Sequence, residues 1–322
     1  MKKFRLPLML TLGIFMIALI INPVRYMASA SMGLKLFAIS VLPALFPFFF
    51  FTRVLTSLGA AHTLGASIKR PLEKLYNAPP ITGYIMAMSM LSGYPTGAKL
   101  VAECHNLELI ECKDAQFASV LCSTSGPLFI LGTIGGVALA DKLAGVVILL
   151  SHYIASLVNG LLYRNKTTGH NPKTVALQLS AKSDNLLRDC IYESIIAILL
   201  VGGYIVIFSM VIDILLDIGL QATLVYLLGL FGIGKEISIA CFASLMEITR
   251  GCFMVSSLPL SRLGKAVFLS GVISFGGICI GLQSLAFLSK CNISAARYFL
   301  AKSSQAVIAI IVATLLGLLI LK

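Results

Sequence analysis

Four short segments combine hydroxyl, glycine, proline and charged residues inside stretches that are otherwise apolar. They cover residues 92–97, 123–127, 247–250 and 274–277. In a helix that lies in lipid, such a break leaves backbone N–H and C=O groups unsatisfied, so it is tolerated only where it is buried in protein or lines a polar cavity. The freed N–H groups carry the positive end of a half-helix dipole. The sequence therefore predicts that the four breaks meet at one site for an anionic or strongly hydrogen-bonding ligand.

Side chains at and beside these breaks supply hydroxyl, amide and charged groups. The candidate substrate-binding residues are Ser92, Tyr94, Thr96, Lys99, Ser123, Thr124, Ser125, Glu247, Thr249, Arg250, Ser274 and Gln283. The serine and threonine hydroxyls could bind a solute or could satisfy the broken backbone. Lys99 and Arg250 each follow a break, and an ionisable group inside a membrane is by default functional. Two cations with Glu247 predict a carboxylate-like solute; alternatively, Lys99 reaches the membrane interface and Arg250 pairs with Glu247.

The residues at the breaks do not identify which ion, if any, is coupled to the solute. Freed carbonyls could hold sodium, and Glu247 or His152 could carry a proton. His152 and Asn159, which lie on one apolar stretch, could line a proton path or could satisfy contacts between helices. Possible Na⁺ or H⁺ coupling therefore stays open.

The sequence lacks the patterns of a metal centre or a catalytic site. The eight cysteines have no CxxC spacing, and Cys104 with His105 and Cys112 lacks a fourth ligand. The chain contains no HExxH or GxSxG motif and no paired carboxylates inside an apolar stretch. We therefore expect neither a metal nor another cofactor, and no enzymatic activity.

The elements that must position the breaks are membrane helices. The chain has 322 residues, 58% of them apolar and 12% charged, with a mean hydropathy of +0.96, which excludes a soluble domain around one core. Stretches of ~20 apolar residues are needed to cross a bilayer. The clear predicted spans are 6–21, 36–52, 143–163, 194–212 and 303–321, and the interrupted ones are 75–104, 115–140, 236–261 and 266–289.

The net charge of +12 comes from basic clusters that flank the spans, which favours contact with lipid headgroups over nucleic acid. If residues 81–104 crossed the membrane fully, the basic linker at 166–188 would lie outside, against the positive-inside rule. A re-entrant hairpin at 81–104 returns the linker to the cytoplasm. By the same argument 236–261 enters from outside, and Arg262 and Lys265 fit this topology least well.

The predicted fold class is an all-α polytopic membrane protein with two inverted repeats. Each repeat has a re-entrant helical hairpin and a broken transmembrane helix, with about seven full spans in total. The predicted parts are an N-terminal helix at 1–29, a first repeat at 30–165, the basic linker at 166–188 and a second repeat at 189–322. Residues 1–29 could be a cleaved signal, but the long apolar run favours a retained helix. Nothing in the sequence decides whether the chain forms a homo-oligomer.

Five motifs resemble the sporulation integral membrane protein family. They are LPALFPFFFF (42–51), LSGYPTGAK (91–99), STSGPLFILGTIG (123–135), MEITRG (246–251) and SFGGICIGLQ (274–283). That family belongs to the nucleoside-recognition or gate-domain superfamily and is related to concentrative nucleoside transporters. The resemblance covers about residues 30–320.

The resemblance implies transport of a small solute during endospore formation, in the bacterial inner membrane or a forespore membrane. The implied cargo is dipicolinic acid, whose carboxylates would suit Lys99 and Arg250. In the nucleoside transporters the corresponding breaks hold sugar and base. The matching positions here are Ser92, Thr96, Ser125, Glu247, Thr249, Ser274 and Gln283. The basic residue after each hairpin turn departs from that pattern, and the alternatives are a nucleoside carrier or a sporulation protein that acts by assembly without transport.

Overall fold

The computed structural model describes residues 2–58, 70–164 and 185–321, which form helices and turns with no strand among them. The helices of the first half are α1 (Lys2–Ile21), α2 (Pro23–Leu36), η1 (Phe37–Val41), α3 (Leu42–Ser57), α5 (Ile81–Ser92), α6 (Thr96–Asn106), α7 (Cys112–Leu121), η2 (Leu128–Ala138) and α8 (Lys142–Leu162). Those of the second half are α9 (Leu186–Leu215), η3 (Leu216–Leu220), α10 (Gln221–Gly229), α11 (Lys235–Met246), α12 (Ile248–Ser257), α13 (Arg262–Phe275), α14 (Gly277–Phe287), η4 (Leu288–Cys291) and α15 (Ala295–Ile320). The predicted all-helical class is confirmed.

Five of the described helical stretches are long and apolar enough to cross a membrane. They are Pro23–Ser57, Lys142–Leu162, Leu186–Gly229, Arg262–Phe287 and Ala295–Ile320. Large apolar side chains remain exposed on them, such as Leu199 at 56% and Leu319 at 73%, as expected of surfaces that face lipid. The chain is therefore a multi-pass membrane protein. The predicted total of about seven spans, which adds α1 and the broken helix α7–η2, stays a prediction.

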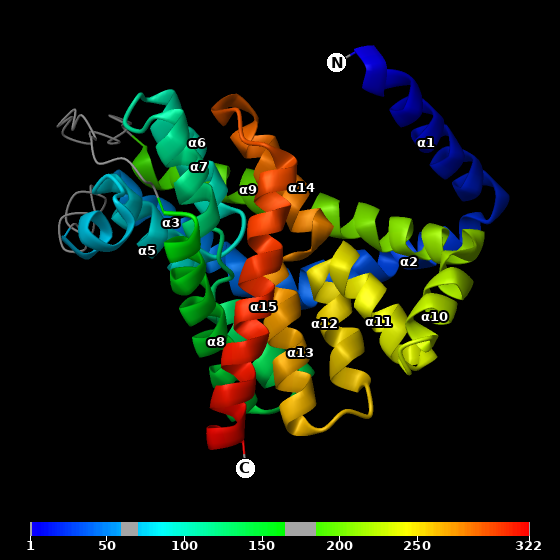
Figure 1. Cartoon of the computed structure of the whole chain (residues 1–322). Coiled ribbons are helices and arrows are strands. Elements are labelled where there is room, and N and C mark those ends of the chain that lie inside the picture. The colour runs from blue at the N-terminus through cyan, green and yellow to red at the C-terminus, as the bar shows by residue number, and fades with distance from the viewer. Residues whose placement is uncertain (1, 59–69, 165–184, 322) are drawn as a thin grey trace.

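The helices pack as an upright group crossed by long tilted ones. Figure 1 shows α8, α13 and α15 side by side, and α15 packs against both of the others. Helix α9 crosses α2 and packs against α3. At ~1.5 Å per residue, the 30 residues of α9 span about 45 Å, more than the ~30 Å of a bilayer core, so this helix must tilt.

The helices stop at each of the four predicted breaks. Helix α5 ends at Ser92 and α6 begins at Thr96, α7 and η2 flank residues 122–127, and Glu247 separates α11 from α12. The fourth break lies at Gly276, whose φ of 84° gives the left-handed conformation that ends α13. Local sequence marks each interruption: glycine ends the helix at the first and fourth breaks, proline precedes the next helix at the first and second, and Glu247 caps the next helix at the third.

Most of the predicted basic linker at 166–188 lies outside the described residues. Helix α9 begins at Leu186, so the last three residues assigned to the linker are helical. The predicted boundary between residues 29 and 30 falls within α2, which runs without interruption through it.

Side-chain contacts join helix ends that the topology places on one side of the membrane. Arg262 forms an ion pair with Asp141, with 2.8 Å between Nη2 and Oδ1, and both residues are predicted to lie outside. At the opposite end, Arg297 Nη1 donates to Gln116 Oε1 at 2.8 Å, and both are predicted to lie inside. The Asp141 partner lowers the cost of placing the Arg262 charge at this end of the molecule, while Arg262 still counts against the positive-inside rule.

This ion pair predicts a pH dependence of stability. The Arg262 guanidinium lowers the pKa of the Asp141 carboxyl from 3.8 to about 2. A lowered folded-state pKa stabilises the fold above the unfolded value, and the contribution is lost as the pH falls through about 2. We expect Asp141→Asn to remove this dependence while it keeps the cap on α8, where the side chain accepts from Ala144 N. Thermal unfolding of the purified protein across this pH window measures it, with Arg262→Gln as the matched variant; identical curves for all three proteins would refute the pairing.

Candidate functional site

The two breaks of the first half are in direct backbone contact. A β-carbon on Gly93 would lie 2.5 Å from Gly126 N, and one on Gly97 would lie 1.9 Å from the Cys122 carbonyl oxygen. The Ser89 hydroxyl donates to the same Cys122 carbonyl. Glycine is therefore required where the turn between α5 and α6 packs on the break between α7 and η2.

His152 on α8 links the first-half break to the second-half break. Ser125 N–H donates to its Nε2 at 2.9 Å, and its Nδ1 lies 2.8 Å from Ser274 Oγ. Because Nε2 must accept, the neutral ring carries its proton on Nδ1 and donates it to Ser274. The ring is fully buried and both nitrogens are used, so the geometry fits a contact between helices, one of the two roles predicted for His152.

The second-half hairpin, formed by α11 and α12, lies against the break between α13 and α14. The Glu247 carboxylate caps α12 by accepting from Thr249 N at 2.9 Å and Arg250 N at 2.7 Å. A β-carbon on Gly277 would lie 3.3 Å from the Ser244 carbonyl oxygen, so the break between α13 and α14 packs against the tip of α11 and α12. The structure thus brings all four predicted breaks together.

Three adjoining cavities run from these breaks to one end of the molecule. The inner cavity, of about 40 Å³, is lined by Tyr94, Ser125, Glu247, Thr249 and Gln283 among others. The middle cavity, of about 240 Å³, is lined by Thr96, Lys99, Gln283 and the α9 face at Ser194 and Val201 among others. The outer cavity, of about 330 Å³, extends to Asn106 and Leu186. Gln283 and Val201 line both the inner and the middle cavity, so these two adjoin.

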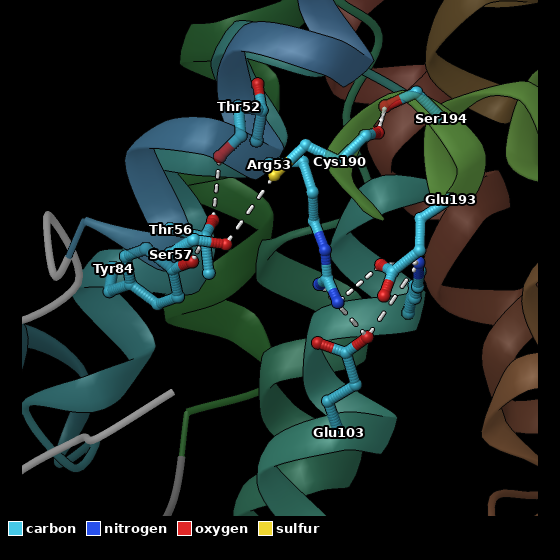
Figure 2. A network of polar contacts seen from close by, with 10 residues as sticks. Thr52, Arg53, Thr56, Ser57, Tyr84, Glu103, Cys190, Glu193 and Ser194 are labelled. Atoms are coloured by element: carbon cyan, nitrogen blue, oxygen red, sulfur yellow. Dashed lines mark hydrogen bonds and ion pairs between the residues drawn. The ribbon is translucent and has the colours of Figure 1, made fainter. Parts of the chain in front are cut away.

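A charged cluster of Arg53, Lys99, Glu103 and Glu193 lies where the middle and outer cavities meet. Figure 2 shows Arg53 of α3 reaching toward Glu103 of α6 and Glu193 of α9. Arg53 Nη1 lies 3.7 Å from Glu103 Oε1, and Lys99 Nζ lies 3.9 Å from one carboxylate oxygen of each glutamate. The four charges cancel, and three of the four residues line both cavities.

Seven of the predicted site residues line the inner or the middle cavity, and five do not. The seven are Tyr94, Thr96, Lys99, Ser125, Glu247, Thr249 and Gln283. Four of the other five are buried hydroxyls with protein partners: Ser92 with Thr52, Ser123 with Tyr298, Thr124 with Ser89, and Ser274 with His152. These four hydroxyls are held by other side chains, so they bind neither a solute nor the broken backbone in this structure.

Arg250, the fifth, lies away from all three cavities. Its Nη1 donates to the Ser209 carbonyl oxygen at 2.9 Å, and its Nη2 donates to Asp213 Oδ1 at 2.6 Å. Its side chain makes no ion pair with Glu247, which takes only its backbone N–H. The expectation of a second site cation at Arg250 is corrected, because Asp213, just beyond the predicted span 194–212, supplies the partner.

Sequence reasoning missed the acids of the charged cluster and the role of Lys302. Glu103 follows Lys99 by four residues, which places both on one helix face and was an available signal. Glu193 has no comparable signal, since only the tertiary fold brings α9 beside α6. Lys302 lies at the edge of the predicted span 303–321, but its side chain is 1% exposed and contacts Tyr94 and Ser123. No cluster of three His, Cys, Asp or Glu side chains suited to a metal ion occurs in the described part of the chain.

Comparison with known proteins supports the resemblance seen in the motifs. The chain is 27% identical over 341 aligned positions to sporulation integral membrane protein YlbJ of Bacillus subtilis (strain 168), across 98% of this chain and 84% of that protein. Its fold is similar to that of CNTnw, a concentrative nucleoside transporter solved as a double variant in an outward-facing state. That likeness has a TM-score of 0.52 and 16% identity, and covers 87% of this chain and 76% of the other. No family model matches the chain.

These comparisons confirm the predicted resemblance to a sporulation integral membrane protein and to a concentrative nucleoside transporter. The chain is similar over nearly its whole length to a bacterial sporulation integral membrane protein, and its helices have the arrangement of a transporter fold. At this identity the structural likeness establishes the fold alone.

The close contact between Gly97 and the Cys122 carbonyl provides a test of whether the two first-half breaks pack together. Gly97→Ala places a methyl group 1.9 Å from the Cys122 carbonyl, and such overpacking destabilises by roughly 1–3 kcal/mol or more. Gly203→Ala on α9 is the matched control, because a β-carbon there has no neighbour within 4 Å. Thermal unfolding in detergent should show a large loss for Gly97→Ala and none for the control. Equal stability of the two variants would mean that the first-half breaks are not in contact.

The placement of Arg250 is tested by a charge-removal pair. Arg250→Met leaves Asp213 without its partner in a site where the two side chains are 12% and 16% exposed, at a cost of roughly 3 kcal/mol. Removing both charges with Arg250→Met and Asp213→Leu should restore most of the stability. A double variant that stays as unstable as Arg250→Met alone would contradict the pairing of Arg250 with Asp213.

Proposed function

We propose that this chain is a membrane transporter that moves a small anionic solute through the three cavities during endospore formation. The likeness to a sporulation membrane protein and to a transporter fold supports the broad role. The solute we propose is a dicarboxylate of the dipicolinate type, bound at the middle cavity and passed to the helix breaks. The proposal includes no chemical change of the solute.

The observation that supports this proposal most is the placement of the Lys99 ammonium in the middle cavity. Its Nζ lies 3.9 Å from the Glu103 and Glu193 carboxylates, beyond hydrogen-bond distance, and it forms no hydrogen bond to a described residue. An ammonium that lines a cavity with its N–H donors unused offers charge-assisted hydrogen bonds to an anion. The cavity also presents hydroxyls of Thr52, Thr56 and Thr96.

Arg53 provides a second cation, at a position the sequence did not indicate as a site. It holds both glutamates and lines the middle and the outer cavity. A carboxylate that enters from the outer cavity can replace Glu103 or Glu193 at the guanidinium, since the exchange conserves the ion pair. The charged cluster would then open as the solute arrives, and the displaced glutamate would repel a second anion.

The short helix pairs fit re-entrant hairpins in an inverted repeat. Helices α5 and α6 have 12 and 11 residues, or roughly 17 Å each, which reaches the middle of a ~30 Å hydrocarbon layer. The second pair, α11 and α12, has 12 and 10 residues and packs toward the same breaks. We propose that the two pairs enter from opposite sides, as in transporters that hold their solute at the midplane.

Nucleoside transport is the second candidate, favoured by the inner cavity. Its polar lining at Ser125, Thr249 and Gln283 suits hydroxyl and amide groups better than a second charge, and Gln283 Oε1 has no hydrogen-bond partner among the described residues. The fold likeness to CNTnw is compatible with this candidate.

Uptake of labelled dipicolinate and labelled uridine into proteoliposomes tests the proposal. Lys99→Met should lower dipicolinate uptake by about tenfold or more, because a lost charge-assisted hydrogen bond costs roughly 1.5–3 kcal/mol. Lys113→Met is the matched control, since Lys113 pairs with Glu111 and lines none of the three cavities.

The alternatives give different results in the same assay. Uridine uptake that is indifferent to Lys99→Met would support the nucleoside candidate. No uptake of either solute by folded protein would contradict both and favour a sporulation role by assembly.

A further inference from the structure

Lys302 of α15 is a buried cation without an acidic partner. Its side chain is 1% exposed, and Nζ donates to Tyr94 Oη at 2.9 Å, the Ser123 carbonyl oxygen at 2.9 Å and Gln305 Oε1 at 2.8 Å. No ion pair joins it to a carboxylate within residues 2–58, 70–164 and 185–321. A buried charge is costly unless dipoles or charges compensate it, so these three oxygens must do so.

The hydrogen-bond geometry around Lys302 fits an ammonium. The Tyr94 hydroxyl donates its proton to the Ile273 carbonyl oxygen at 3.3 Å, so its oxygen accepts from Lys302. The Ser123 carbonyl and the Gln305 amide oxygen can only accept. An ammonium satisfies all three oxygens at once with its three N–H donors, whereas a neutral amine would have to accept from the Tyr94 hydroxyl in place of that hydroxyl's longer bond to Ile273.

The Lys302 ammonium lies beside a broken helix, at the kind of position where a cation binds. Helix α7 ends at Leu121, and Ser123 lies in the break that follows, so its carbonyl is near the negative end of the α7 dipole. In transporters with discontinuous helices, such unwound carbonyls and half-helix C-termini coordinate the coupling Na⁺ or H⁺. Tyr94, from the turn between α5 and α6, supplies a second oxygen and lies with its ring centroid 5.0 Å from Nζ.

We infer that the Lys302 ammonium occupies this cation site permanently, as a tethered substitute for a sodium ion. The substitute bridges the first-half hairpin turn, the first-half break and α15, and through Tyr94 it reaches the second-half break at Ile273. The site is therefore complete without sodium, and the chain's fold and any transport it performs are independent of sodium at this position. Only the statement on transport rests on the proposed function.

The test compares thermal unfolding of the full-length protein in sodium chloride and in choline chloride at equal ionic strength. The wild type should melt at the same temperature in both salts. Lys302→Ala vacates the ammonium's place beside the three oxygens, so it should melt lower in choline and regain stability in proportion to added sodium. Lys302→Met is the matched control, because its side chain fills the space without charge, and it should not respond to sodium.

Two results would overturn the inference. One is a sodium-dependent rise in the melting temperature of the wild type, which decides the matter even if a variant fails to fold. The other is a folded Lys302→Ala protein that responds equally to sodium and choline. Because no solute is present, these outcomes are independent of whether dipicolinate or uridine is transported. If uptake is observed, it should proceed at the same rate in both salts.

Discussion

Broken helices in lipid must find partners for their freed backbone groups, and this constraint organises the whole structure. The breaks of the first half pack closely at Gly93 and Gly126, and side chains satisfy the freed backbone groups: the His152 ring accepts from Ser125 N–H and contacts Ser274, and the Ser89 hydroxyl donates to the Cys122 carbonyl. Each break would be unstable alone. Their convergence explains why the short helices gather around α8, α13 and α15, and why small cavities remain where four interrupted backbones cannot fill space as completely as continuous helices do.

The charges of the molecule are compensated in two different ways according to depth. Toward the ends, opposite side chains pair, as Arg262 does with Asp141 and Arg53 with Glu193. At the breaks, backbone dipoles replace counter-ions: Glu247 caps α12 with two N–H donors, and Lys302 lies against the carbonyl of Ser123. Dipoles that are already fixed by the fold need no reorganisation and bring no second desolvated charge, so they suit a region that excludes water.

Sequence patterns predicted the positions of the breaks well, because glycine, proline and capping residues act locally. The same patterns placed Lys99, Thr96 and Gln283 at a cavity, where the structure has them. They failed where the partner comes from a distant helix. No sequence pattern near Arg250 predicts its pairing with Asp213. Hydropathy places Lys302 at the edge of a span, although α15 begins seven residues earlier and carries Lys302 into the core. Charge counting thus predicts which ends of the helices share a side, while the identity of each partner depends on tertiary packing.

The inner and middle cavities share two walls, Val201 on α9 and Gln283 on α14. Because the same side chains bound both spaces, a displacement that enlarges one by moving α9 along α14 narrows the other, and separation of the two helices fuses them into a single chamber. A displacement of this kind adds volume to one of the two cavities and removes it from the other. A single movement of α9 would thus couple the space beside the charged cluster to the space beside the capped helix.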